Sequence, residues 1–237
     1  MLDEVNNYIF NDNPLKALEI VKSIDTDEAR ELQKKLEHKL RHVLYPEKYI
    51  EKYRDDPMNW RPEYNWNDRY EWVWNNIKSH NAKSFIDLGC YEGSLVLKAG
   101  SKGIESVGVE LCIAACHFNT SRIAENTNCK FINEQIEEYK DTRKYDIVSC
   151  MEVIEHVADP QKLISVIKSL MHEDSIALIT TPRGCYDLQN TIKIWNEPDT
   201  VFDHVRSYEP NTLKDEINTK NVSIYTKGKE LYASFKL

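Results

Sequence analysis

The sequence has few glycines, no closely paired cysteines and no long apolar run. No stretch of 18 apolar residues occurs and the mean hydropathy is -0.60, which predicts that no helix of this chain crosses a membrane. The absence of a Cys-x-x-Cys pair argues against a zinc site or a disulfide framework. Free thiols favour a reducing, cytoplasmic compartment, and the start, MLDEVNNYIF, lacks the features of a secretory signal. The six cysteines stand at positions 90, 112, 116, 129, 150 and 185.

Positive charge is also scarce. The chain has 31 Lys and Arg against 39 Asp and Glu, a net charge of -8, which disfavours a broad electrostatic interaction with nucleic acid. Hydrophobic residues make up 41% and charged residues 30% of 237 positions. This composition is typical of a globular protein, and the length suits one full domain with a smaller appendage.

From residue 83 onward, short β-like runs alternate with helical stretches. Such alternation predicts a parallel sheet with helices on both faces. The predicted parallel strands are 84–88, 106–111, 130–136, 145–151 and 175–181. An antiparallel pair at 222–225 and 230–237 flanks the turn TKGK. Helices are expected at 94–102, 113–125, 160–171 and 211–218. We predict an α/β fold in residues 81–237, a doubly wound seven-stranded sheet of five parallel strands plus a C-terminal antiparallel pair.

Residues 1–80 are predicted to form a helical, aromatic-rich N-terminal extension. Asn13-Pro14 opens a helix to about residue 22, and an apolar stripe predicts a longer helix to residue 43. Four of the five tryptophans lie in 57–76. We favour a helix that packs on the sheet, and a cover over an active site is compatible with it. The extension can also shape the acceptor site, form a homodimer or dock another protein, and periodicity does not separate these roles.

Five of the seven glycines lie between residues 89 and 108. In FIDLGCYEGSL, a strand ending at Asp87 runs into a turn with Gly89 and Gly93, and Ser94 is expected to cap the next helix. In a doubly wound sheet this turn lies at the carboxyl edge, where ligands bind. The spacing fits neither the dinucleotide G-x-G-x-x-G nor a phosphate loop, which disfavours a nicotinamide oxidoreductase. Asp87 suits a cationic ligand, such as an amino group or a sulfonium.

A second acidic residue follows the next strand. SVGVEL places Glu110 at a strand end, seventeen residues after Gly93. A carboxylate at this position can accept hydrogen bonds from both hydroxyls of a ribose. The glycine turn and Glu110 together therefore favour a nucleoside ligand.

The order of these motifs resembles the class I S-adenosylmethionine-dependent methyltransferases. The resemblance covers residues 83–237 and rests on the segments FIDLGCYEGSL, GVEL, FINEQIEEY, YDIVSCMEVIEHVADP and ALITTP. It implies S-adenosyl-L-methionine as the cofactor. By position, it places Asp87, Gly89, Cys90 and Gly93 around the methionine part, Glu110 at the ribose, Leu111, Gln135 and Ile136 at the adenine, and Met151 near the sulfonium. Gln135 departs from the Asp that is usual in the family, although its amide oxygen can still accept from the adenine amino group.

The segment after the fourth strand carries Glu152, Glu155 and His156, spaced i, i+3 and i+4. If this turn is helical, the three share one face. His156 can act as a general base, helped by either glutamate, since an unperturbed histidine titrates near neutral pH. Alternatively the three can hold Mg²⁺ or Mn²⁺, or they can be structural.

The spacing E-x-x-E-H resembles two methyltransferase groups, the ubiquinone-pathway phenol O-methyltransferases and the small-RNA 3′-terminal 2′-O-methyltransferases. The resemblance implies that these positions are associated with a metal. It also implies a further metal-associated histidine after the fifth strand in the RNA group, at a place that His204 can occupy. The long connection 183–209 is expected to cover the acceptor.

The leading functional prediction is O-methylation of a hydroxyl on a small molecule or saccharide. One alternative is metal-dependent RNA 2′-O-methylation, which the net charge of -8 disfavours. The other is a cofactor-binding module without acceptor chemistry.

Overall fold

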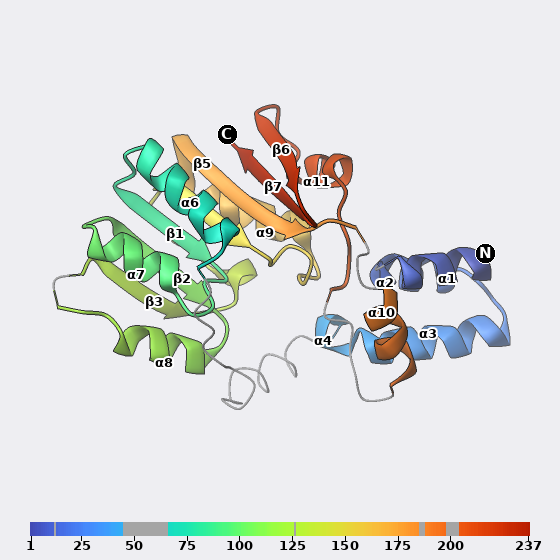
Figure 1. Ribbon diagram of the computed structural model, residues 1–237. Coiled ribbons are helices and arrows are strands. Elements are labelled where there is room, and N and C mark those ends of the chain that lie inside the picture. Colours follow the sequence, from blue (N-terminus) through green and yellow to red (C-terminus); the bar gives the residue numbers. More distant parts are fainter. Residues whose placement is uncertain (12, 45–65, 126, 185–187, 198–203) are drawn as a thin grey trace.

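The structure of the protein is a computed structural model that describes residues 1–11, 13–44, 66–125, 127–184, 188–197 and 204–237. A sheet with helices on both faces occupies one side of the molecule, and a small helical bundle lies beyond the carboxyl end of the sheet's central strands (Figure 1). Within the described ranges, every helix is too short or too polar to cross a membrane.

The sheet has seven strands in the order β3-β2-β1-β4-β5-β7-β6. All neighbouring pairs are parallel except β5–β7 and β6–β7, which are antiparallel. The predicted fold class is therefore confirmed. The strands are β1 (Ser84–Leu88), β2 (Glu105–Glu110), β3 (Cys129–Asn133), β4 (Tyr145–Met151), β5 (Met171–Pro182), β6 (Val222–Lys227) and β7 (Glu230–Phe235).

The strand ends differ from the prediction in two places. β3 ends at Asn133, and a short 3-10 helix, η2 (Ile136–Glu138), begins where the strand was expected to end. β5 begins at Met171, because Met171 pairs with Tyr145 and the chain is already extended there. The long apolar run from residue 176 is the buried part of this central strand, as expected for a strand covered on both faces.

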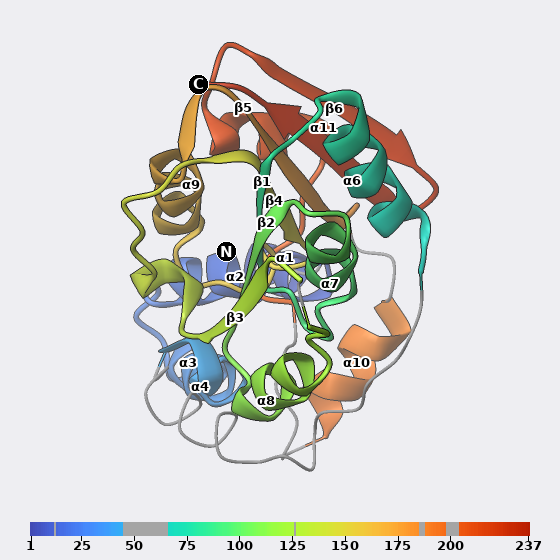
Figure 2. The ribbon, with the colours of Figure 1, turned by 90° about the vertical axis from the view of Figure 1, so that its left-hand side faces the viewer.

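Helices cover both faces of the sheet (Figure 2). One face carries α6 (Asp68–Ser79) and α7 (Ser94–Ser101), and the other carries α9 (Pro160–Ser169) and α11 (Pro210–Ile217). α8 (Ile113–Ser121) lies beside β3 and β2. Asp159 caps α9 by accepting from the N–H of Lys162 at 3.0 Å, as its sequence predicts. The predicted Ser94 cap is wrong, because Ser94 is the first helical residue and Gly93 holds the N-cap in a left-handed conformation.

The aromatic helix α6 packs on the sheet. Its buried side chains Val73, Trp74 and Ile77 belong to one apolar cluster with Phe85 of β1 and Leu178 of β5. Packing is therefore confirmed for this part of the aromatic segment, and Trp60 and Tyr64 lie outside the described residues. The domain boundary that the sequence places at residue 80 stays a prediction.

The N-terminal helices form a bundle with its own apolar core. They are α1 (Leu2–Phe10), α2 (Pro14–Val21), α3 (Asp27–Lys39) and α4 (Arg41–Leu44). The single helix predicted to residue 43 is divided at Leu40, whose non-helical backbone separates α3 from α4. A further helix, α10 (Leu188–Asn196), comes from the long connection after β5 and lies against this bundle (Figure 1).

Gly108 of β2 supplies a test of the packing on the sheet. A Cβ at this position would lie 2.6 Å from Cys90 Sγ and 2.7 Å from Phe131 Cδ1. We expect Gly108→Ala to lower the free energy of unfolding by about 1–3 kcal/mol, because both neighbours would have to move in a close-packed core. Urea unfolding followed by circular dichroism measures this loss, and an unchanged midpoint and slope would contradict the close approach.

Candidate active site

The turn after β1 lies against the residues that follow β4. The N–H groups of Gly89 and Cys90 both donate to the carbonyl of Val109, at 2.9 and 3.1 Å. Gly89 has a φ of 76°, and a Cβ built on it would lie 2.5 Å from Val153 Cγ2. Only glycine satisfies both the left-handed backbone and this close approach. Two of the predicted site segments therefore meet at the carboxyl edge of the sheet.

Buried carboxyl groups surround this turn. Asp87 is 2% exposed and accepts a 2.5 Å hydrogen bond from Ser149 Oγ on the neighbouring strand. Burial raises the pKa of Asp87 to about 7, against the effect of the Ser149 bond and with help from Glu92 and Glu110. A cationic ligand placed here would stabilise the ionised carboxylates.

Glu92 is a buried carboxylate in the glycine turn that the sequence analysis did not single out. It is 2% exposed, and its carboxylate accepts a 2.7 Å hydrogen bond from the Tyr70 hydroxyl on α6. The bond joins the aromatic helix to the glycine turn. Position 92 stands inside the turn motif, which is a signal that could have drawn attention to it, whereas nothing in the sequence pairs it with Tyr70.

Glu110 lies between the glycine turn and the start of α8. Its Oε2 accepts from the N–H of Tyr91 at 3.0 Å, and its Oε1 accepts from the N–H of Cys112 at 2.8 Å. Burial raises its pKa, and these backbone bonds oppose that effect. The backbone of Leu111 also hydrogen-bonds this carboxylate. The carboxylate thus lies against the turn that follows Gly89.

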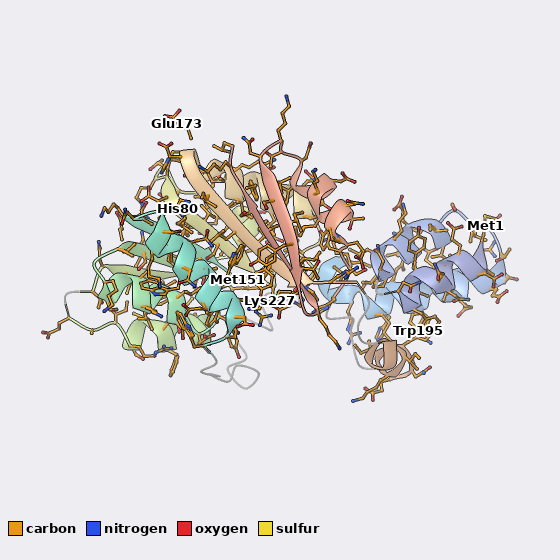
Figure 3. The ribbon with its side chains drawn as sticks, turned by 45° about the horizontal axis from the view of Figure 1, so that its top comes forward. Met1, His80, Met151, Glu173, Trp195 and Lys227 are labelled. Atoms are coloured by element: carbon orange, nitrogen blue, oxygen red, sulfur yellow. The ribbon has the colours of Figure 1, made fainter. Side chains whose placement is uncertain are left out.

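The remaining predicted cofactor residues lie near the same edge. Ile136 Cδ1 is 3.6 Å from the place where a Cβ of Gly89 would stand, and Cys90 is buried. Leu111 and Gln135 are half-buried, each just after a strand of the sheet. Met151 ends β4 and packs partly buried against the cluster that contains α6 (Figure 3). Their part in binding the cofactor stays a prediction.

The turn after β4 is not helical, so the condition for a shared helical face is not met. Glu152 has a φ of 54°, and the turn is closed by the N–H of His156 donating to the carbonyl of Val153. Glu152 is directed to other partners: Arg69 at 2.9 Å and the Thr180 hydroxyl at 3.0 Å. Burial raises the pKa of Glu152, and Arg69 opposes this.

Glu155, His156 and His204 converge. One ligand atom from each lies within 4.8 Å of the others. The rings of His156 and His204 are edge to face with centroids 4.8 Å apart, and Glu155 Oε1 is 3.8 Å from His156 Nε2. Of the four predicted metal ligands, these three form the cluster, and Glu152 is not part of it.

Glu155 is the most constrained member of this cluster. It is 1% exposed, and Oε2 accepts a 3.0 Å bond from the Thr181 hydroxyl, while Oε1 is buried without a hydrogen-bond partner. Burial, with Glu152 nearby, holds the pKa of Glu155 well above its ordinary range. A buried oxygen of this kind needs a proton, a donor or a cation to compensate it.

The strand order, the glycine turn after β1 and Glu110 at the end of β2 are together the organisation of the class I S-adenosyl-L-methionine-dependent methyltransferases. The sequence pattern of the family described as "Methyltransferase domain" matches residues 36–224. The chain belongs to this family, and the predicted resemblance to the methyltransferases is confirmed.

Curated relatives agree with this assignment. The chain is 25% identical over 169 residues to the ubiquinone biosynthesis O-methyltransferase of Rickettsia canadensis, covering 69% of this chain and 66% of the relative. It is 32% identical over 107 residues to the enzyme of the same name from Glaesserella parasuis, covering 42% and 45% of the two chains. The chain thus spans two thirds or less of the length of these relatives.

Solved structures share the fold. The methyltransferase domain of bacterial CtHen1 superposes with a TM-score of 0.54 at 23% identity, covering 71% of this chain and 97% of that domain. The N-methyltransferase NodS of Bradyrhizobium japonicum, in complex with S-adenosyl-L-homocysteine, gives a TM-score of 0.57 at 14% identity, with 80% and 96% covered.

The buried carboxyl of Asp87 predicts an unusual pH dependence of stability. Because its pKa is about 7 in the folded chain against an ordinary 3.8, the folded state keeps a proton that the unfolded state releases between about pH 4 and pH 7. The free energy of unfolding therefore falls as pH rises through this window. Asp87→Asn removes this titration. We therefore expect the difference in the free energy of unfolding between the variant and wild type to shift in favour of the variant by on the order of 2–4 kcal/mol when the pH is raised from 4.5 to 7.5, measured by urea unfolding.

Asp146→Asn is the matched control. Burial would raise the pKa of Asp146, but hydrogen bonds from the N–H groups of Lys83 and Ser84 and from His172 lower it on balance. Its ionised form stabilises the fold, so this variant should show no such gain. An equal gain in both variants would contradict the assignment to Asp87.

Proposed function

We propose that this protein transfers the methyl group of S-adenosyl-L-methionine to a hydroxyl oxygen of a small molecule or saccharide. The observation that carries the proposal is the convergence of Glu155, His156 and His204 beside the glycine turn. The names of the curated relatives, which are O-methyltransferases, support oxygen as the acceptor atom. The leading prediction from the sequence is retained.

The cofactor supplies an activated methyl group on a sulfonium. The protein must hold the acceptor oxygen in line with that methyl and remove its proton. We assign the removal of this proton to His156, which is partly exposed and lies beside the buried Glu155 carboxyl. Glu155 in its ionised form would orient the imidazole and stabilise its positive charge, and His204 faces the same position.

A divalent cation is compatible with the same three residues. The buried, unpartnered oxygen of Glu155 fits a cation ligand, and both imidazoles lie within reach of it. Two nitrogen donors favour Mn²⁺ over Mg²⁺, which takes oxygen ligands. When bound there, the ion would lower the pKa of an acceptor hydroxyl. Glu152, held by Arg69 and Thr180, would lie outside this set in the present arrangement.

One observation favours a second acceptor, the terminal ribose hydroxyl of a small RNA. The resemblance to the RNA group implies a histidine after the fifth strand, and His204 joins the cluster from that connection. A net charge of -8 opposes the binding of a phosphate backbone. A small molecule or saccharide therefore remains the first choice.

An acceptor screen with a labelled methyl donor tests the proposal. We expect methyl transfer to a phenolic or sugar hydroxyl, and His156→Ala should lower kcat by about 10²–10⁴-fold because general-base catalysis contributes that much. His172→Ala is the control, since His172 bonds Asp146 away from the site and should leave kcat unchanged.

Chelation separates the two roles of the cluster. Loss of transfer with a chelator, restored by Mn²⁺, would assign the three residues to a metal, and unchanged transfer would assign His156 as the base. Transfer to a small RNA in place of every small acceptor would select the second function. Tight cofactor binding without transfer to any hydroxyl would reject both functions in favour of a binding module.

The proposed role of Glu110 at the ribose can be tested through the affinity for the cofactor. We expect Glu110→Gln to raise the Kd for S-adenosyl-L-methionine about tenfold or more, since hydrogen bonds that involve a charged acceptor are the stronger ones. Isothermal titration calorimetry measures this change. Glu105→Gln, an exposed carboxylate at the opposite end of the same strand, should bind the cofactor as wild type does. An unchanged Kd for Glu110→Gln would remove Glu110 from the ribose site.

A further inference from the structure

We propose that the N-terminal bundle positions His204 for the acceptor site, and that Lys39 is the positioning residue that fixes the connection carrying it. The inference rests on the proposed function, because it assigns His204 to the acceptor cluster. Among the roles that the sequence left open for the N-terminal extension, it selects the shaping of the acceptor site and names the contact responsible.

The bundle core contains residues from one other part of the chain. Its buried members from α1 to α3 include Val5, Ile9 and Leu36, and the cluster is joined by Val205, with Ile194 and Trp195 packed against it. Among the described residues, every member from outside the bundle thus comes from 194–205. The apolar clusters of the sheet contain no described residue of the bundle. The bundle core is therefore built around the connection after β5.

Lys39 joins the bundle to the end of α10. Its side chain, at the end of α3, is 2% exposed and its Nζ donates to the carbonyl of Glu197. The N–H of Glu197 still bonds the carbonyl of Lys193, so the helical pattern extends to Glu197. A buried ammonium at a helix C-terminus satisfies a terminal carbonyl and interacts favourably with the helix dipole.

A second contact reinforces this one. Lys35 Nζ, one turn earlier on α3, lies 3.9 Å from the centre of the Trp195 ring. Trp195 on α10 lies beside the N-terminal bundle (Figure 3). A cation over the face of an indole ring is attracted by the ring's electrons. Two lysines of α3 therefore hold α10 from one side.

Three consecutive residues then connect the bundle to the acceptor cluster. His204 faces the His156 ring, and the fully buried Val205 enters the bundle core. The N–H of Val205 donates to the carbonyl of Glu155 at 3.0 Å. Arg206 donates to the carbonyls of Val157 and Ala158, in the turn that carries His156. The position of His204 is thus set on one side by the bundle and on the other by the catalytic turn.

Lys39→Met tests the proposal in the full-length protein, since methionine keeps the apolar stem and removes the ammonium. Hydrogen exchange of 192–197 and 204–208 should become at least tenfold faster, while exchange in β1 and β4 stays unchanged. The His204 ring resonance, assigned with His204→Gln, should move toward the shift of an exposed histidine as it leaves the His156 ring. The affinity for S-adenosyl-L-methionine should remain within twofold of wild type.

Two further variants keep the test decisive. Lys34→Met, on the same helix but exposed and bonded to Glu31, should leave all three measurements unchanged. Trp195→Ala loosens the same contact from the side of α10 and should reproduce the effect if Lys39→Met fails to fold. An unmoved His204 resonance in folded Lys39→Met or Trp195→Ala would overturn the proposal. None of these measurements needs an acceptor, so failure of the proposed methyl transfer is observed separately.

Discussion

The close approach of Gly89 to Val153 is the constraint on which the site depends. A side chain on Gly89 would overlap Val153, so the turn after β1 and the turn after β4 can lie in contact only with a glycine there. The contact brings the acidic turn after β1 beside the turn that carries Glu155 and His156. The proposed methyl transfer would require this proximity, because donor and acceptor must be held in line.

Burial of charge is the second feature that unifies the structure. Four carboxyl groups are nearly inaccessible to solvent: Asp87, Glu92, Glu110 and Glu155. Acidic side chains are mostly exposed in proteins, because burial removes their hydration. Their cost is partly offset by hydrogen bonds from Ser149, Tyr70, backbone N–H groups and Thr181. The uncompensated oxygen of Glu155 marks the place where a proton, a substrate or a cation completes the site. The burial of these carboxyl groups lowers the stability of the fold, and such buried acidic groups are common at functional sites.

The connection after β5 links the bundle to the turn after β4. Val205 enters the bundle core, and its N–H donates to the carbonyl of Glu155. Its neighbour His204 faces the His156 ring, and Arg206 donates to the carbonyls of Val157 and Ala158. The bond between Lys39 and Glu197 holds the same connection against the bundle.

The sheet and its carboxyl edge could be predicted from the sequence. The spacing of apolar residues and of glycines is a local property of the chain, so β1 and β4 match their predicted bounds. For the same reason the glycine turn, Glu110 and the Glu155-His156 pair are found at the carboxyl edge. Only the folded arrangement shows that Glu152 pairs with Arg69 while Glu155 joins His204. The left-handed backbone of Glu152 separates residues whose helical spacing implied a common face. The fold also brings Tyr70 to Glu92 and Lys39 to Glu197. The sequence does not predict these contacts, because pairing between distant segments leaves no periodic signal along the chain.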